Sequence, residues 1–250
     1  MLLVSCTRIG NNQPDTPGPH DGGGGGTTPT STPEPLPPTP NPTEPTCDDC
    51  TPTPTPKRFD KAIFICGMRD GTACAMGSAS LHPFREWAER NGYGSGDFSI
   101  FDVDLCTAAA PDGKGKLECA NRAVSVMVSD GAARFLLVGH SAGADAVIVA
   151  GDRMTDKGRI AGIALLDPTL TATLESDIPG QTHTNLQSMA DNLPQPKFLG
   201  DTLDAGDRIN VFIDGAGEKE YPELSHADLA LQEYPVTDMV NAFGWSEMLE

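Results

Sequence analysis

Basic residues are scarce in this chain of 250 residues, in which 17 lysines and arginines stand against 35 aspartates and glutamates, a formal net charge of −18. This charge repels a phosphate backbone, so a nucleic-acid partner is not expected. Uninterrupted apolar runs of about eighteen residues are also lacking, which excludes a bilayer-spanning helix. What remains is an acidic protein for which nucleic-acid binding is not the expected main function and in which no bilayer-spanning helix is expected.

The first part of the chain lacks the apolar residues of a core. Residues 7–57 hold 14 of the 22 prolines, the run Gly22–Gly26 and many threonines. This composition predicts a disordered Pro/Thr/Gly-rich linker that keeps a domain away from a surface. Residues 58–250 carry 29 acidic and 15 basic side chains, a net charge of −14. This segment is long enough to bury a sizeable core in one globular domain.

Residues 1–6 form a possible processing site. Leu3-Val4-Ser5-Cys6 resembles the lipobox of bacterial lipoproteins, in which the cysteine is lipidated and becomes the mature N-terminus. A secretory signal needs about 7–15 apolar residues, so we expect these six residues to be the remnant of a longer signal. The resemblance implies an extracytoplasmic protein, either secreted or attached to the cell envelope through Cys6.

The cysteines fit an oxidising compartment. Without a lipidated Cys6, an even number remains, which favours disulfides. Cys47 and Cys50 form a C-x-x-C in the linker, where no strand and helix flank it, so redox chemistry is not predicted. No second C-x-x-C is present to complete a zinc site, so a metal is not predicted either. The pairing of the other four is left open. They are Cys66, Cys74, Cys106 and Cys119.

Beyond the linker, apolar strand patterns alternate with helical periodicity. Strands of this kind separated by helices predict a doubly wound α/β domain, with a mostly parallel sheet of about five strands covered on both faces. Strands are predicted at 61–67, 98–103, 134–138, 160–166 and 209–213, and helices at 80–91, 117–128, 142–154, 186–193 and 236–243.

The most specific motif follows the strand at 134–138. Gly139-His140-Ser141-Ala142-Gly143 is a G-x-S-x-G sequence between a strand and a buried helix, the context of a nucleophile elbow. Small flanking residues let strand and helix close around a tight turn, which presents the serine hydroxyl above the sheet and the helix N-terminus beside it. Ser141 is therefore the predicted nucleophile, and the backbone N–H of Ala142 the predicted oxyanion donor.

A serine needs a base to become nucleophilic, and a histidine oriented by a carboxylate supplies it. His226 and His183 are the candidates among the five histidines, since His20 lies in the linker, His82 precedes the nucleophile and His140 lies inside the elbow. In this fold the order along the chain is serine, acid, histidine, with the histidine after the last strand. This order favours His226.

The acid is less sharply defined. Asp167 ends the strand at 160–166, Asp214 ends the strand at 209–213, and Glu218 follows four residues later. Each could reach a histidine above the carboxyl ends of the strands.

Together these segments resemble a known family. Gly139-His-Ser-Ala-Gly-Ala144 with Gly151, followed by Arg159-Ile-Ala-Gly-Ile-Ala-Leu-Leu-Asp167-Pro168, is similar to the α/β-hydrolase serine esterases, particularly neutral lipases and the platelet-activating-factor acetylhydrolase and chlorophyllase types. The resemblance implies that Asp167 is the acid, ranked above Asp214. It also suggests Met68, after the first core strand, as the second oxyanion donor.

These residues predict a serine hydrolase that cleaves small-molecule or lipid carboxylic esters through an acyl-enzyme, with no cofactor, metal or protein partner. A thioesterase or peptidase using the same triad remains an alternative, because the triad fixes acyl transfer and not the leaving group. An inactive surface protein that keeps the fold to bind a ligand is another. The helix at 186–193 lies where such folds carry a cap, so Leu186, Met189 and Leu193 line an acyl pocket or form the buried face of a covering helix.

Overall fold

A computed structural model describes residues 57–67, 81–110, 114–131, 133–169, 183–202 and 213–249. The lipobox-like residues 1–6 lie outside the described residues, as does the linker 7–57 apart from Lys57. The same holds for Met68 and for Cys6, Cys47, Cys50 and Cys74.

The core of the domain is a six-stranded parallel sheet with the strand order β2-β1-β3-β4-β5-β6. The first strand in the sequence therefore lies inside the sheet, with β2 on one side of it and the later strands on the other, as in doubly wound sheets. The strands are β1 (Lys61–Cys66), β2 (Phe98–Asp102), β3 (Phe135–His140), β4 (Ile160–Leu166), β5 (Lys197–Asp201) and β6 (Ala216–Glu220).

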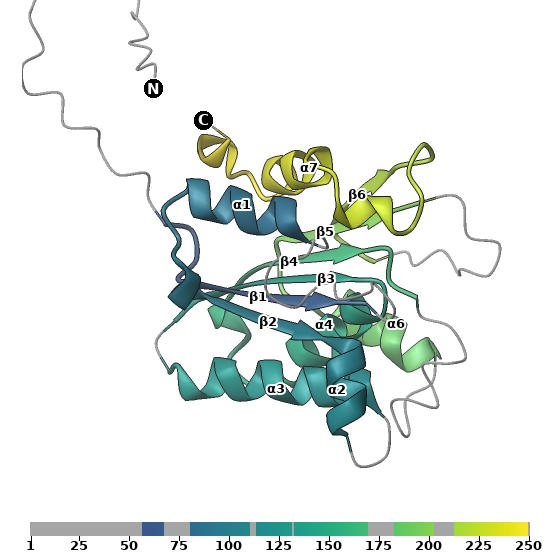
Figure 1. Ribbon diagram of the computed structural model, residues 1–250. Helices are drawn as coiled ribbons and strands as arrows, with labels where there is room; N and C mark the ends of the chain where they lie inside the picture. Colours follow the sequence, from purple (N-terminus) through teal and green to yellow (C-terminus); the bar gives the residue numbers. More distant parts are fainter. Residues whose placement is uncertain are drawn as a thin grey trace, which may run out of the picture. The chain divides into compact units, whose positions relative to one another are not determined.

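Helices cover both faces of the sheet, as Figure 1 shows, with α1 and α7 on one side and α2, α3, α4 and α6 on the other. This three-layer arrangement confirms the predicted α/β class. The helices are α1 (His82–Arg90), α2 (Val103–Ala109), α3 (Gly115–Ser129), α4 (Ala142–Arg153), α6 (His183–Asp191) and α7 (Tyr234–Ala242).

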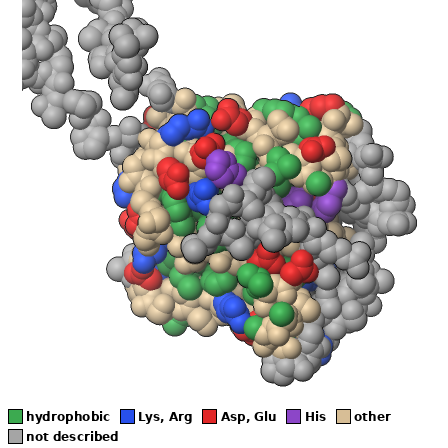
Figure 2. All heavy atoms as spheres, viewed as in Figure 1, with side chains coloured by type: hydrophobic (Ala, Val, Ile, Leu, Met, Phe, Trp, Pro, Cys, Tyr) green, Lys and Arg blue, Asp and Glu red, His purple; other side chains and the backbone are tan. Residues whose placement is uncertain are grey.

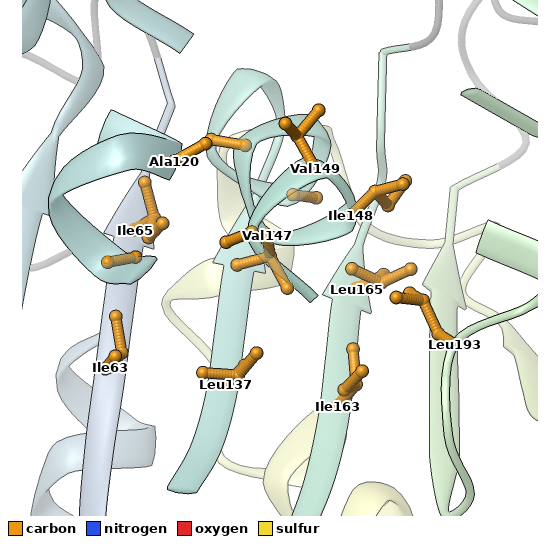
Figure 3. Close-up of a cluster of buried hydrophobic side chains, with 14 of the residues drawn as sticks. Ile63, Ile65, Ala120, Leu137, Val147, Ile148, Val149, Ile163, Leu165 and Leu193 are labelled. Atoms are coloured by element: carbon orange, nitrogen blue, oxygen red, sulfur yellow. The ribbon is translucent and has the colours of Figure 1, made fainter. Parts of the chain in front are cut away.

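Alternating residues of the buried strands enter two separate hydrophobic cores. In β1, Ile63 and Ile65 face α3 and α4, whereas Ala62 and Phe64 face α1 and α7. Figure 3 shows the first core, where side chains of α4 meet those of the three central strands. Because both faces are buried, the central strands are apolar throughout, which is why they could be recognised in the sequence.

The sheet differs from the expectation in its last strands. A strand was predicted at 209–213, but Ile213 lies in no strand and residues 209–212 lie outside the described residues. The strands that follow β4 are β5 and β6, which the sequence did not reveal. The segment Lys197–Asp201 is short and has a charged residue at each end. The segment Ala216–Glu220 is a largely exposed edge strand, so neither contains an apolar run.

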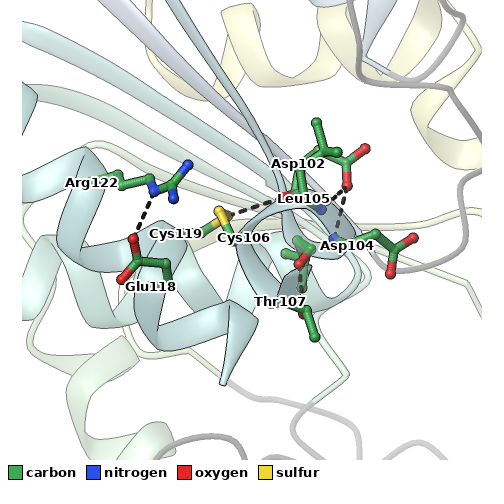
Figure 4. The surroundings of a disulfide bond; sticks show 9 residues. Asp102, Asp104, Leu105, Cys106, Thr107, Glu118, Cys119 and Arg122 are labelled. Atoms are coloured by element: carbon green, nitrogen blue, oxygen red, sulfur yellow. Dashed lines mark hydrogen bonds and ion pairs between the residues drawn. A yellow bond between two sulfur atoms is a disulfide. The ribbon is translucent and has the colours of Figure 1, made fainter. Parts of the chain in front are cut away.

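Helix α2 was also missed, because it begins immediately after β2. Asp102, the last residue of that strand, caps α2 by accepting hydrogen bonds from the N–H groups of Asp104 and Leu105. A disulfide joins Cys106 of α2 to Cys119 of α3, which decides part of the pairing left open above (Figure 4).

The surface mixes side chains of different kinds. Figure 2 shows acidic, basic and hydrophobic groups interspersed over the face that it draws. None of the helices in the described ranges combines the length and the apolar composition that a bilayer crossing requires.

Candidate active site

The turn between β3 and α4 is built around two glycines. A Cβ on Gly143 would lie 2.0 Å from the carbonyl oxygen of Ile65, and a Cβ on Gly139 would lie 2.6 Å from the Cα of Ala144. Both contacts are with backbone atoms, which no side-chain rotation could relieve. The small residues of the G-x-S-x-G motif are therefore needed for the helix to pack against strands β1 and β3.

Ser141, the predicted nucleophile, lies at the apex of this turn. Its backbone has φ 56° and ψ −129°, a conformation that costs a non-glycine residue about 1–3 kcal/mol. Its N–H donates to the carbonyl of Leu166 at 2.8 Å, which ties the apex to the end of β4. Although Ser141 is the N-cap residue of α4, its hydroxyl makes no capping bond to the helix. The hydroxyl is thus directed away from the helix.

The partner of that hydroxyl is His226, whose Nε2 lies 2.8 Å from Oγ of Ser141. His226 belongs to the loop between β6 and the 3-10 turn Asp228–Ala230, and its side chain is 31% exposed. The other ring nitrogen, Nδ1, lies 2.7 Å from Oδ2 of Asp167. The carboxylate can only accept, so Nδ1 carries the proton and Nε2 is left to accept the serine proton.

Asp167 directly follows β4 and is completely buried. Its φ is 50°, and its N–H donates to the carbonyl of Gly200 in β5 at 2.7 Å. The hydroxyl of Thr202 donates to the same Oδ2 that accepts from His226, at 2.8 Å. Thr202 therefore fixes the orientation of the carboxylate and is a site residue that the sequence did not reveal, because the strand that precedes it was not recognised.

The backbone is strained at two of the three residues of the candidate triad. In the described ranges, three non-glycine residues have positive φ, and two of them are Ser141 and Asp167. Strain of this kind persists where the surrounding structure enforces it, and it is concentrated at functional sites.

The structure does not bring the other candidate residues to this site. Asp214 lies in an exposed turn, where its N–H donates to a carboxylate oxygen of Asp191, and Glu218 is exposed on the edge strand β6. His82 lies on the surface of α1, where its Nδ1 is 3.5 Å from a carboxylate oxygen of Glu86. The side chain of His183 and all of His20 lie outside the described residues. The structure thus brings Ser141, Asp167 and His226 together, as the sequence favoured.

Of the two predicted oxyanion donors, Ala142 is described and Met68 is not. Ala142 is the first residue of α4 and directly follows Ser141, so its N–H has no acceptor within the helix and lies at the positive end of the helix dipole.

Helix α6, the candidate cap, packs against α4. Leu186 and Leu193 are buried in the core beside α4, and Met189 is packed against that core. Leu186 and Met189 belong to the buried face of a covering helix, and Leu193, which follows the end of α6, is buried in the same core. This favours the second of the two interpretations offered by the sequence.

The segment after Asp167 is held by a buried ion pair. Asp145, in the first turn of α4, accepts hydrogen bonds from the backbone N–H and the hydroxyl of Thr169. The ammonium of Lys116 lies 3.6 Å from Oδ2 of Asp145, and both side chains are buried. This pair connects α3 and α4 to the backbone that follows the acid.

The loop that carries His226 is anchored where it leaves the sheet. Tyr221 is buried there, its N–H donates to the carbonyl of Asp201, and its hydroxyl donates to Asp238 of α7 at 2.7 Å. Burial raises the pKa of Tyr221 above its ordinary value of 10.0, and the hydrogen bond to Asp238 raises it further. The phenol therefore stays neutral and serves as a fixed anchor.

No three His, Cys, Asp or Glu side chains gather as metal ligands anywhere in the part of the chain that the structure describes.

No protein-family model matches this chain, and a search of curated proteins finds no significant match. Solved structures that this chain resembles include the esterase domain of a Rhodothermus marinus protein (14% identity, TM-score 0.47, 79% of this chain and 88% of that chain covered). An esterase of Pyrococcus furiosus (11%, 0.46, 74% and 82%) and the type II thioesterase of the yersiniabactin pathway (13%, 0.45, 77% and 96%) are others. At identities this low, the activity of this chain has to be inferred from its own residues.

Proposed function

We propose that this chain is a serine hydrolase that cleaves carboxylic esters through an acyl-enzyme on Ser141. The observation that carries the proposal is the continuous hydrogen-bonded series from Oγ of Ser141 through the imidazole of His226 to Asp167, with distances of 2.8 and 2.7 Å. Both lie within the range over which a nucleophile, its base and the orienting acid act together.

In the proposed first step, Oγ of Ser141 attacks the ester carbonyl carbon while Nε2 of His226 takes the hydroxyl proton. The tetrahedral intermediate collapses, the carbon–oxygen bond to the alcohol breaks, and His226 returns the proton to the leaving alcohol. In the second step a water gives a proton to Nε2 of His226 and attacks the acyl carbon. The bond between that carbon and Oγ of Ser141 then breaks, His226 returns the proton to Oγ, and the carboxylic acid is released.

Asp167 and Thr202 serve the base in this scheme. The carboxylate of Asp167 holds Nδ1–H and stabilises the imidazolium that forms in each step. Its burial strengthens that interaction, since little water competes for the carboxylate. The hydroxyl of Thr202 keeps the carboxylate in the orientation that this contact requires.

The developing oxyanion is proposed to bind the N–H of Ala142 and, as the family resemblance suggests, that of Met68. The Ser141 N–H cannot contribute, because it already donates to Leu166. Two donors of this kind are worth about 10²–10³ in rate each.

A fluorophosphonate probe tests the proposal directly. The full-length protein should be labelled on Ser141, as identified by mass spectrometry, and Ser141→Ala should abolish labelling. Ser125→Ala, which removes an exposed serine of α3, is the matched control and should label as the wild type does. A folded protein that takes up no probe would contradict the proposal and favour an inactive binding protein.

Replacing the two candidate acids separates their roles. We expect Asp167→Asn to reduce turnover by about 10⁴-fold, because the amide no longer enforces the productive tautomer of His226. Asp214→Asn should leave turnover nearly unchanged, since Asp214 lies in an exposed turn. The reverse result would show that the acid is misassigned.

The substrate class is proposed as esters of small molecules or lipids. A panel of esters, thioesters and peptides with matched acyl groups tests this part separately. Faster turnover of thioesters or peptides would leave the triad in place and change the class of hydrolase.

We also propose that the chain is an extracytoplasmic lipoprotein attached through Cys6. Protein made from its natural gene should partition into the detergent phase, whereas Cys6→Ser should remain in the aqueous phase. Aqueous partitioning of the wild type would contradict attachment through Cys6.

A further inference from the structure

The buried histidine of the elbow contacts the backbone of the catalytic base. Nε2 of His140 lies 2.8 Å from the carbonyl oxygen of His226, and the two imidazole rings are 4.7 Å apart at an interplanar angle of 35°. His140 is only 1% exposed. The residue next to the nucleophile in the sequence therefore contacts the residue that activates it, 86 positions later in the chain.

This contact fixes the tautomer of His140. A backbone carbonyl oxygen can only accept a hydrogen bond, so Nε2 of His140 must carry the proton and donate it. The bond is therefore the reverse of the one in which Nε2 of His226 accepts from Ser141. The two neighbouring imidazoles have different protonated nitrogens, each set by its own partner.

The consequence is that His226 is held at both its side chain and its backbone. Asp167 holds the ring through Nδ1, and His140 holds the main-chain carbonyl of the same residue. The loop around His226 lies between β6 and a 3-10 turn, so the sheet does not fix it. His140 lies at the end of β3, a central strand with both faces buried. Its hydrogen bond thus couples a loop to a strand that is buried along its whole length in the interior of the sheet.

We propose that His140 is a positioning residue, which keeps Nε2 of His226 within reach of Ser141 by hydrogen bonding to the His226 backbone. This inference rests on the proposed function and goes beyond it by giving a role to the variable residue of the G-x-S-x-G motif. In this proposal His140 acts through His226 and not on the substrate itself. It acts by limiting the positions that the base can adopt, and a displacement of about 1 Å at such a site costs on the order of 10²-fold in rate.

The test compares two substitutions of similar size that differ in one donor. His140→Gln keeps an N–H at about the same distance from the backbone, whereas His140→Met fills similar space without a donor. We expect His140→Met to lower kcat by about 10- to 100-fold with KM changed less than about threefold, because loss of positioning affects the chemical step. His140→Gln should recover most of this loss.

A third variant keeps the test informative if His140→Met unfolds. His140→Phe keeps a ring against His226 and removes the donor, so it should behave like His140→Met wherever it folds, as checked by circular dichroism. Equal kcat values for His140→Gln and a folded donor-free variant would overturn the proposal. If neither His140→Met nor His140→Phe folds, a His140→Gln protein with wild-type stability and no activity would overturn it as well.

Failure of the proposed function would be recognised independently. If wild-type protein takes up no fluorophosphonate at Ser141, the hydrolase proposal fails and the positioning role falls with it. If the wild type is labelled but His140→Gln and the donor-free variants have the same kcat, the hydrolase proposal stands and the role proposed for His140 is wrong.

Discussion

The packing of Gly143 against strand β1 allows the cost of a single methyl group to be worked out. In Gly143→Ala the new Cβ would lie 2.0 Å from the carbonyl oxygen of Ile65, whereas ordinary contact begins at 3.4 Å. Helix α4 and the end of β1 must therefore separate by about 1.4 Å. Overpacking of this kind lowers the free energy of unfolding by about 1–3 kcal/mol. We expect a value at the upper end because the atoms that the new Cβ meets belong to the backbone of β1 and cannot rotate away.

The same displacement reaches the candidate site, because Gly143 is two residues from Ser141. A shift of about 1 Å in a catalytic group costs on the order of 10²-fold in rate, so we expect kcat/KM for an activated short-chain ester to fall by about that factor. Ester hydrolysis and urea denaturation should be measured on the same preparation.

Gly131→Ala is the matched control. No atom lies within 4 Å of its Cβ position, and its backbone is outside the positive-φ region. This substitution should leave activity unchanged and stability the same or slightly higher, by up to about 1 kcal/mol. If Gly143→Ala instead behaved like this control, with activity within about twofold of wild type, close packing at the elbow would not be what the motif requires.

Three further outcomes are expected. Replacing both Cys106 and Cys119 by serine should lower the free energy of unfolding in urea by about 3 kcal/mol, since the disulfide closes a short loop of 13 residues; a loss under about 1 kcal/mol would contradict this. Lys116→Met should cost about 3–5 kcal/mol, because the carboxylate of Asp145 stays buried without its cation, and a cost typical of surface pairs, under about 1 kcal/mol, would refute it. Because the pKa of Tyr221 is raised in the folded state, the free energy of unfolding should be constant with respect to this group below pH 10.0 and should fall as pH rises above it. Tyr221→Phe should make this loss of stability with pH less steep, and an equally steep loss would contradict the raised pKa of Tyr221.

The nucleophile could be predicted because its requirements are local. Gly139 and Gly143 lie within two residues of Ser141, so the motif can be recognised in five consecutive residues, although the atoms that exclude a Cβ at Gly143 belong to the distant strand β1. The central strands were also predictable, since burial of both faces makes them continuously apolar.

The acid could only be narrowed to a few residues, because its identity depends on the number of strands. Recognition of β5 and β6 would have shown that Asp214 precedes β6, at the amino end of a parallel strand, whereas Asp167 follows the carboxyl end of β4, and this removes Asp214 from consideration. Lys197 makes this strand difficult to recognise in the sequence, because a lysine is normally expected to face solvent. Here its ammonium is buried and donates to carbonyls of α6. Thr202 and the contact of His140 are long-range features, which no local pattern encodes.

The edge strand β6 has a consequence for how the protein behaves at high concentration. An edge strand presents unpaired backbone groups to which a strand of another molecule could add. Glu218, Lys219 and Glu220 are exposed along this edge, so a second copy pairing there in register would bring like charges into close contact. The same charged residues that hide β6 in the sequence therefore discourage the growth of the sheet from one molecule into the next, which favours solubility when many copies are crowded together.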